Sequence, residues 1–329
     1  MTDPDRPQFN LVDEPFIPSV ALDGEAVEHG LRDVLVRAHD LRELRDDSPL
    51  VTIALQRLFI AVLHAVLGDP ETLDDWGEMW QAGRFDEAAI DDYFEKWRGR
   101  FDLFDPERPF YQDPDLDESE PDRSAANRLI TGTDPTDTLF EHSTNPKKER
   151  DRWEPISAAE AARRLIAIQV CAISGGRGYY KMPFAEGVVV MPQGENLFET
   201  LTLNTLPAEE RDEFLQPAGT AVWQQDNSPF DRKGLPRGYQ QFLTWLPRRV
   251  RLYPQVNGSV QTISIAAGPQ LMLPEHCFEP WLAYVERSKG PMPLGFGDDR
   301  AVWRDSEAIL RFSVQGDEKG RIPSLLRFV

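Results

Sequence analysis

Hydrophobic residues recur at helical spacing from Leu50 to Leu67, and Gly68 follows the last of them. A face of this width predicts a helix of about five turns, with Asp47 or Ser48 as its N-cap. A glutamine, an arginine and a histidine interrupt the run. The pattern therefore indicates a buried amphipathic helix and not a membrane span.

A second helical pattern follows residue 157. Ser157 and Glu160 have the spacing of a capping box, and alanine, leucine and isoleucine then recur as far as Ile173. Further helices are expected within residues 31–37 and 71–100, and the second of these segments is rich in tryptophan and acidic residues.

Strand patterns lie on both sides of these helices. Residues 9–20, "FNLVDEPFIPSV", alternate in polarity and contain two prolines, which predicts an edge strand because proline has no N–H to donate. Residues 239–255 and 260–268 also indicate strands, with the Asn257–Gly258 pair as a hairpin turn. Helices and strands do not alternate as βαβ units, so an α+β fold is expected, with helices packed on mainly antiparallel sheets and long irregular loops.

The segment "SGGRGYYK", residues 174–181, places three glycines, two cations and two tyrosines directly after a predicted helix. Phosphate-binding glycine loops instead precede a helix, whose N-terminus meets the phosphate. The simplest interpretation is a helix C-cap, with Gly175 or Gly176 in the left-handed conformation. A cap accounts for one glycine and leaves the other two unexplained.

Charge limits the partners of this chain. Its 56 acidic and 36 basic residues give a formal net charge of -20, which opposes unspecific binding to nucleic acid. High acidity is also typical of proteins from salt-tolerant organisms. Nucleic acid is therefore expected only at a focused site or with the help of partner subunits. Three local basic patches are present, namely Lys147, Lys148, Arg150 and Arg152, then Arg232, Lys233 and Arg237, and then Arg248, Arg249 and Arg251.

Signatures of catalysis or metal binding are weak. The five histidines are scattered, no GxSxG or HExxH motif occurs, and Cys171 and Cys277 are expected to be buried free thiols. We predict no cofactor, no metal ion and no enzymatic activity, although the carboxylates within residues 102–122 leave an acidic hydrolase open as an alternative. The N-terminus lacks a signal-peptide pattern, so a cytoplasmic protein is expected.

The order of motifs resembles that of a known family. After "FNLVDEPFIPSV" come "DDSPLVTIALQRLF", "ERPFYQ", a long polar loop, the glycine segment, "EPWLAY" and "GFGDDRAVWRD". The series resembles the large subunit, CasA, of the type I-E CRISPR surveillance complex Cascade. The likeness spans almost the whole chain, which implies a CasA-like N-terminal globular domain over residues 1–329 without the family's C-terminal helical bundle.

This resemblance implies a function. Such a subunit performs no chemistry, recognises the protospacer-adjacent motif of double-stranded DNA through the minor groove, promotes duplex opening and helps recruit a helicase-nuclease. Its implied partners are the other Cascade subunits, the guide RNA, double-stranded target DNA and the helicase-nuclease. No membrane is expected as a partner. An acidic protein-interaction scaffold that makes no direct DNA contact is the alternative.

The resemblance also implies three sets of contact residues. The glycine loop, residues 174–181, would contact the DNA motif. A wedge hairpin at about 295–304 would separate the strands, and a mobile loop at about 113–152 would touch the guide RNA handle or a neighbouring subunit. The residues carried over are Gly175, Gly176, Arg177, Gly178 and Lys181 for the motif, Asp299, Arg300 and Ala301 for the wedge, and Thr136, Asp137 and Phe140 for the mobile loop.

One feature of the family is missing from this chain. Members carry a lysine upstream of the "EPWLAY" position, but no lysine lies between Arg251 and Arg287. Gln270 or one of the arginines at 248, 249 and 251 is the candidate replacement, and the sequence leaves the choice open.

Overall fold

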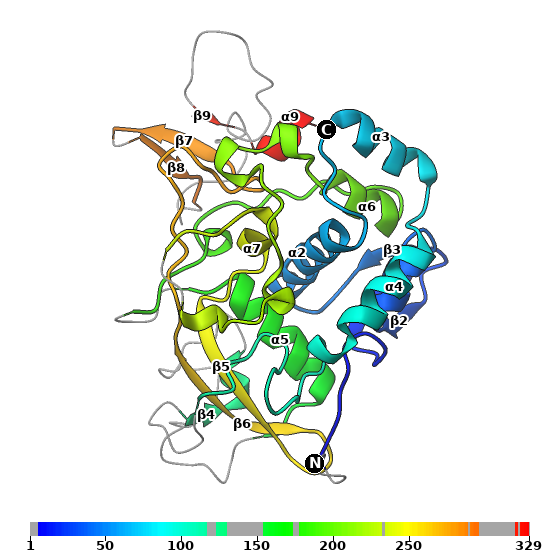
Figure 1. Ribbon diagram of the computed structural model, residues 1–329, viewed down its shortest axis with the longest axis vertical. Coiled ribbons are helices and arrows are strands. Elements are labelled where there is room, and N and C mark those ends of the chain that lie inside the picture. The colour runs from blue at the N-terminus through cyan, green and yellow to red at the C-terminus, as the bar shows by residue number, and fades with distance from the viewer. Residues whose placement is uncertain are drawn as a thin grey trace.

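The computed structural model describes residues 6–116, 123–129, 154–173, 178–231, 234–288, 290–295, 320–321 and 323–328. Within this part of the chain, helices pack against small antiparallel sheets, which confirms the predicted α+β class (Figure 1). The helices are α1 (Leu31–Val36), α2 (Pro49–Val66), α3 (Leu73–Ala82), α4 (Glu87–Trp97), α5 (Ala158–Val170), α6 (Leu197–Leu203), α7 (Tyr239–Leu243) and α9 (Ser324–Phe328). The strands are β1 (Ile17–Ala21), β2 (Ala26–His29), β3 (Leu41–Leu44), β4 (Arg123–Ala125), β5 (Arg248–Pro254), β6 (Val260–Ala267), β7 (Tyr284–Arg287), β8 (Gly290–Pro293) and β9 (Gly320–Arg321).

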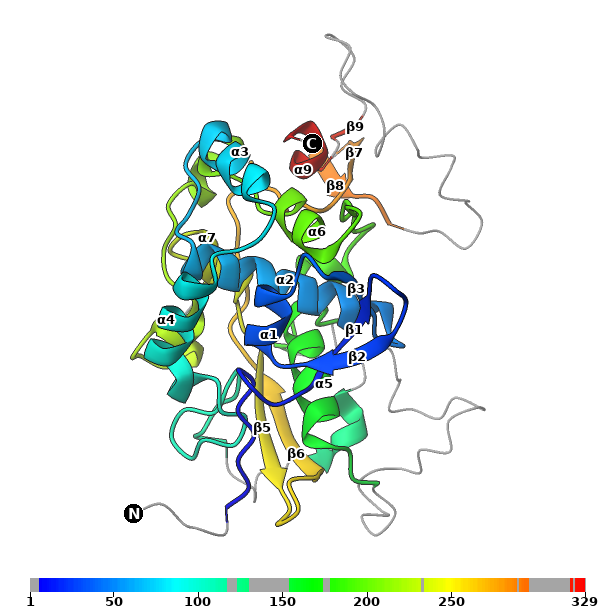
Figure 2. The same cartoon turned by 90° about the vertical axis from the view of Figure 1, so that its right-hand side faces the viewer.

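Helix α2 crosses the centre of the molecule, with other helices around it (Figure 2). Ser48, one of the two predicted caps, is its N-cap residue, and Pro49 occupies its first turn. The helix is long and apolar enough to cross a bilayer by composition alone, yet 67% of that stretch is buried inside the protein. The burial confirms α2 as the central core helix.

Helix α5 packs on α2 and leads to the glycine segment. The Ser157 hydroxyl accepts a hydrogen bond from the Glu160 N–H at 3.1 Å, which is half of the predicted capping box. The helix ends at Val170, three residues earlier than expected, with Cys171 as its C-cap. Cys171 and Cys277 are buried free thiols, as predicted.

The first sheet has the order β2-β1-β3. The prediction that residues 9–20 form an edge strand is wrong, because β1 is the central strand. Pro18 is tolerated because its backbone faces the end of the β1–β3 ladder: β3 pairs with β1 only from Ser19 onward, and the Pro18 carbonyl accepts from the N–H of Arg45.

The second sheet has the order β4-β6-β5, and β5 and β6 form a long antiparallel ribbon. Strands β5 and β6 and the turn at Asn257–Gly258 were predicted, whereas β4 was not. Residues 239–243 are helix α7 and not strand. All five side chains are buried, so the segment lacks the buried and exposed alternation of a strand with one solvent-facing side. The third sheet, β8-β7-β9, was not predicted, and its β7–β8 hairpin projects from the molecule (Figure 1).

Candidate nucleic-acid interface

The two chain segments that flank the glycine segment are joined at its base. The Met182 N–H donates a hydrogen bond of 2.8 Å to the Ala172 carbonyl. The side chains of Ala172 and Met182 then pack with that of Trp245. Ile173 and Tyr180, just beyond this closure, are 57% and 43% exposed. The described residues on the two sides of the glycine segment therefore form a closed and packed base.

Arg248 at the start of β5 holds the same base from inside. Its guanidinium donates to the carbonyls of Ile173 and Tyr180, the latter at 2.8 Å, and its Cζ lies 5.1 Å from the ring centroid of Tyr179. Burial lowers the pKa of this guanidinium from its usual value, with only 3% of the residue exposed. Arg248 is thus a structural clamp for the glycine segment, and it was not identified as one from the sequence.

Gly178 lies where the described chain resumes after the glycine segment. Its φ is +84°, a conformation that residues with a Cβ rarely adopt, and an added Cβ would lie 3.3 Å from that of Ala267 in β6. The neighbouring Tyr179 hydroxyl donates to the Ile265 carbonyl at 3.2 Å. A glycine is therefore required here to fit the chain against the end of β6.

The helix C-cap interpretation of Gly175 or Gly176 is wrong. Helix α5 ends at Val170 and its C-cap is Cys171, which has a φ of -107°. The helix therefore ends before either glycine. Ala172 and Ile173, which follow it, belong to the closed base through their bonds to Met182 and Arg248. Gly175, Gly176 and Arg177 lie outside the described residues.

The chain that follows the glycine segment lies near the chain that enters the predicted wedge hairpin. Lys181 forms an ion pair of 3.1 Å with Glu186. A Cβ added at Gly295 would lie 4.0 Å from the Glu186 carbonyl oxygen. Glu186, five residues after the end of the glycine segment, therefore links Lys181 to the chain at Gly295, more than a hundred positions away in the sequence.

A close backbone contact maintains this approach. The Val188 N–H donates to the Leu294 carbonyl at 2.7 Å, and a Cβ on Gly187 would lie 2.9 Å from the same oxygen. Only glycine leaves room for the two chains at that separation. Val189, in the same segment, forms an isolated β-bridge with Leu282.

The structure also shows the surroundings of three of the four candidate replacements for the family's lysine. Arg248 is buried and holds the loop base, and Arg249 forms an ion pair with Asp113. Gln270 is exposed, and the residues on either side of it are attached to the loop base. The Pro269 carbonyl accepts from the Trp245 indole, and Leu271 packs against the cluster of Ala172, Met182 and Trp245.

The remaining sequence predictions lie outside the described residues. These are the wedge residues Asp299, Arg300 and Ala301 and the mobile-loop residues Thr136, Asp137 and Phe140. The entry to the mobile loop is described, and Asp113 there is held by Arg249 and accepts from the Asp115 N–H at 3.0 Å. These contacts give that buried carboxylate a structural role, which removes it as a candidate for the hydrolase alternative.

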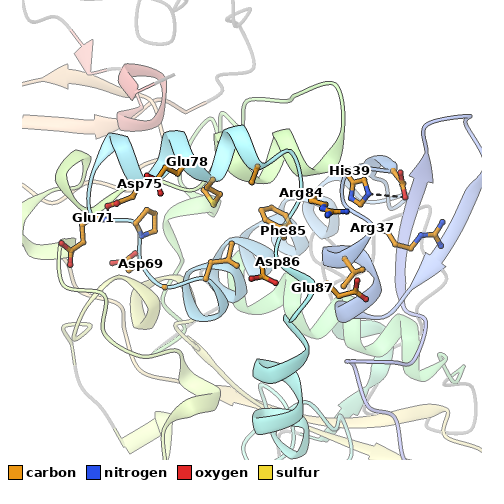
Figure 3. Close-up of a pocket in the computed structure, with 17 residues that line it drawn as sticks. Arg37, His39, Asp69, Glu71, Asp75, Glu78, Arg84, Phe85, Asp86 and Glu87 are labelled. Atoms are coloured by element: carbon orange, nitrogen blue, oxygen red, sulfur yellow. Dashed lines mark hydrogen bonds and ion pairs between the residues drawn. The ribbon is translucent and has the colours of Figure 1, made fainter. Parts of the chain in front are cut away.

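A large cleft elsewhere on the molecule has the wrong charge for nucleic acid. It measures about 1140 Å³ and is lined by residues at the ends of α1 and α2, along α3 and at the start of α4 (Figure 3). Its lining carboxylates outnumber its basic side chains, and those labelled in Figure 3 are Asp69, Glu71, Asp75, Glu78, Asp86 and Glu87. Phosphates would be repelled there. The region around the glycine segment is the better candidate for a DNA contact.

Sequence reasoning missed the residues that support this region, namely Gln169, Glu186, Gly187 and Arg248 as a clamp. Gln169 lies in the apolar pattern of α5, yet its amide donates to the backbone carbonyls of Tyr111 and Arg248 at 3.2 and 3.0 Å. A glutamine on the buried face of a helix was the one local signal that this position has a polar partner.

Comparisons with known proteins agree with the resemblance found in the sequence. The family model described as CRISPR-associated protein Cse1 matches residues 10–329. The CRISPR-associated protein CasA/Cse1 of Thermus thermophilus is 34% identical over 316 residues, which are 92% of this chain and 60% of that relative. This chain therefore spans about three fifths of that relative's length.

Solved structures give the same result. The structure of Cse1 from Acidimicrobium ferrooxidans is 29% identical with a TM-score of 0.78, and 98% of this chain matches 64% of it. Cse1 from Thermobifida fusca is 27% identical with a TM-score of 0.80, covering 98% and 66% of the two chains. A chain of a CRISPR RNA-guided surveillance complex also has 27% identity and a TM-score of 0.80, with coverage of 98% and 68%.

Proposed function

Because this chain belongs to the CRISPR-associated Cse1 family, we propose that it is a non-catalytic subunit of an RNA-guided surveillance complex and recognises the protospacer-adjacent motif of target DNA. It reads this motif through the minor groove of the duplex, promotes strand opening and helps recruit a helicase-nuclease. Its partners are the other Cascade subunits and the guide RNA, in the cytoplasm.

One observation carries this proposal more than any other. Glu186 forms an ion pair with Lys181 at the end of the glycine segment, and its carbonyl oxygen lies 4.0 Å from a Cβ added at Gly295, where the predicted wedge hairpin begins. A motif reader and a strand separator must act on neighbouring base pairs, so they have to lie within the length of a short duplex. The proximity of these described residues supports the proposal.

The composition of the loop fits the minor groove. That groove is about 6 Å wide and presents a degenerate pattern, so a backbone without bulky side chains can enter it. The clamp by Arg248 limits the conformational entropy that the loop loses when it binds, because its two ends are already fixed. Gln270 takes the place of the family's lysine at the edge of the loop base and can both donate to and accept from base edges.

The wedge residues Asp299, Arg300 and Ala301 and the mobile-loop residues Thr136, Asp137 and Phe140 complete the proposal through the family resemblance. Arg300 would insert at the opened base pair and also hold a phosphate. The net charge of -20 is compatible with this proposal, because a narrow loop supplies the sequence specificity while partner subunits supply most of the affinity for phosphates.

The test replaces Gly178 with valine in the chain assembled with its partner subunits and guide RNA. The β-branched side chain is strained at a φ of +84° and collides with Ala267, so the loop moves. The ratio of dissociation constants for a duplex with and without the motif is measured. We expect this discrimination to fall by at least about tenfold, the effect of one badly mismatched base pair, while assembly is unchanged.

Gly24→Val is the matched control. Gly24 has a φ of +93° in the β1–β2 turn, and nothing lies within 4 Å of a Cβ added there. The valine therefore introduces similar backbone strain away from the site. If Gly178→Val and Arg300→Ala both retain full motif discrimination, the protein is better described as an acidic scaffold that does not touch DNA.

A further inference from the structure

The central helix α2 carries a charged side chain, Arg57, inside the core. Only 1% of the residue is exposed, and its guanidinium pairs at 2.8 Å with Glu279, whose side chain is also fully buried. Removing both charges from water costs free energy that an apolar pair of the same volume would not cost. The pair is therefore a weak stabiliser of the fold, and its directional contacts are what distinguish it from apolar packing.

The guanidinium of Arg57 joins three segments that lie far apart in the sequence. Its Nε donates to the Leu243 carbonyl at 3.2 Å and its Nη2 to the Phe242 carbonyl at 3.5 Å, both at the end of helix α7. Its Nη1 donates to Glu279, the first residue of "EPWLAY". Its Cζ lies 4.7 Å from the ring centroid of Phe184, which comes three positions after the glycine segment.

Two of these segments lead to the closed base of the glycine segment. Helix α7 is followed within five positions by Trp245, which packs in that base, and by Arg248, which clamps it. Phe184 follows Met182, whose N–H closes the base on the Ala172 carbonyl. Both connections place the glycine segment relative to the guanidinium on α2.

The third segment leads to the entry of the predicted wedge hairpin. Two positions after Glu279, the ring centroid of Trp281 lies 5.3 Å from the Cζ of Arg57. Farther along the same segment, the Ala283 carbonyl accepts from the Leu294 N–H at 2.8 Å, one residue before the hairpin region begins. The chain that Glu279 and Trp281 anchor therefore sets the position of the hairpin entry.

We propose that Arg57 is the positioning residue that fixes the glycine segment and the wedge hairpin relative to each other. This proposal rests on the function proposed above. A planar guanidinium with five donors holds two carbonyls and a carboxylate at fixed angles while its faces contact aromatic rings. An apolar side chain would fill the same space without fixing these angles. Strand opening needs such fixing, because the wedge must meet the base pair next to the motif that the loop holds.

Loss of these contacts should separate reading of the motif from opening of the duplex. The base of the glycine segment keeps its own closure through Met182 and its clamp through Arg248, so the motif is still read. The wedge is no longer held at the neighbouring base pair, so a paired duplex opens less readily. A target that is already open beside the motif does not need this step.

The test compares two targets in the complex assembled with partner subunits and guide RNA. Both carry the motif and match the guide, but one has a short run of mismatched base pairs beside the motif. Arg57→Met combined with Glu279→Gln removes the contacts and leaves no buried charge alone. It should bind the paired target at least about tenfold more weakly, or about 1.4 kcal/mol, the mean stacking free energy of one base-pair step.

A second variant tests the same contact at a smaller cost in stability. Phe184→Leu removes one aromatic ring from the face of the guanidinium and should weaken binding of the paired target about threefold. Both variants should bind the mismatched target as tightly as the unaltered complex does, and both should keep their preference for the motif. A loss of folded protein would weaken binding of both targets, so the mismatched target separates positioning from general destabilisation.

Two controls accompany these variants, and melting temperatures are recorded for all of them. Phe16→Leu truncates a fully buried ring of the same core just before β1, and it should change binding of neither target. Gly178→Val disturbs the reading loop itself, so it should lower the preference for the motif on both targets, and the mismatches should not restore it.

The inference is overturned, with the proposed function intact, if the folded double variant binds the paired target as tightly as the unaltered complex does. It is equally overturned if the mismatches fail to restore binding. Phe184→Leu decides the question by the same criteria if the double variant does not assemble. If the unaltered complex shows no preference for the motif, the proposed function itself fails and the inference fails with it.

Discussion

Replacing Arg248 with methionine should release the base of the glycine segment. The substitution keeps an unbranched side chain of similar length but removes every donor. Arg248 donates to the carbonyls of Ile173 and Tyr180 and also to that of Pro247 at 3.0 Å. The first two of these hydrogen bonds connect the opposite flanks of the segment, so their loss opens the base itself.

The size of the effect follows from these two contacts. A hydrogen bond from a charged donor contributes about 1.5–3 kcal/mol, and the lower half of that range applies because Ile173 and Tyr180 are partly exposed and water can reach their carbonyls. The closed base should therefore lose about 3–4.5 kcal/mol. That change raises the population of the open base by a factor of roughly a hundred to a thousand, at about 1.4 kcal/mol for each tenfold.

Amide hydrogen exchange measures this opening directly. The Met182 N–H is protected by its bond to the Ala172 carbonyl, so its exchange rate should rise by the same factor in Arg248→Met. Arg45→Met is the control, because the Arg45 side chain is 73% exposed and lies away from the loop. Unchanged protection at Met182 in a folded Arg248→Met protein would refute the assignment of Arg248 as the clamp.

Three further predictions concern the packing beside this site and two ion pairs in the rest of the protein. Gly187→Ala should weaken motif-dependent DNA binding in the assembled complex while barely changing the melting temperature, because the added Cβ separates Gly187 from Leu294; equal binding would show that this contact is unimportant. Burial alone would raise the pKa of Asp69, but hydrogen bonds from His64 and Arg211 outweigh it and lower that pKa to about 2. Its folded pKa is below the unfolded value, so about 2 kcal/mol of stability should be present above pH 4 and disappear as the pH falls toward 2. Urea unfolding of Asp69→Asn should lack that pH dependence, and a dependence equal to that of the unaltered chain would contradict the ion pair. Arg57→Met and Glu279→Gln should each cost about 3–5 kcal/mol in urea unfolding, because each leaves one member of a fully buried ion pair alone; the double variant should cost clearly less than the sum, and simple additivity would argue against the pair.

Periodicity predicted the long elements. Helix α2 and the ribbon of β5 and β6 fall in this group, because many residues repeat the same pattern there. The β7–β8 hairpin was not predicted, because β8 reads "GPMP" and its glycine and two prolines do not form a strand pattern. Proline is compatible with β8 because that strand lies at the edge of its sheet.

The candidate site was only partly accessible to sequence reasoning. The glycine segment stood out because three glycines exceed what a helix end requires. Its supports did not, because they act across long distances in the chain. Arg248 looked like one member of a solvated basic patch and is buried by residues 68 and 75 positions away. The need for glycine at 187 arises from Leu294, which no local pattern reveals.

Base analogues in the DNA motif give the most direct test of minor-groove reading. The complex is assembled with this chain, and its preferred motif is selected from a randomised duplex library. Replacing guanine by inosine removes a minor-groove amino group, and replacing adenine by 2,6-diaminopurine adds one, whereas 7-deazapurines alter only the major groove. We predict that the minor-groove analogues change the dissociation constant by about tenfold or more and that the 7-deazapurines leave it unchanged. Sensitivity to the 7-deazapurines with indifference to inosine and diaminopurine would contradict the account.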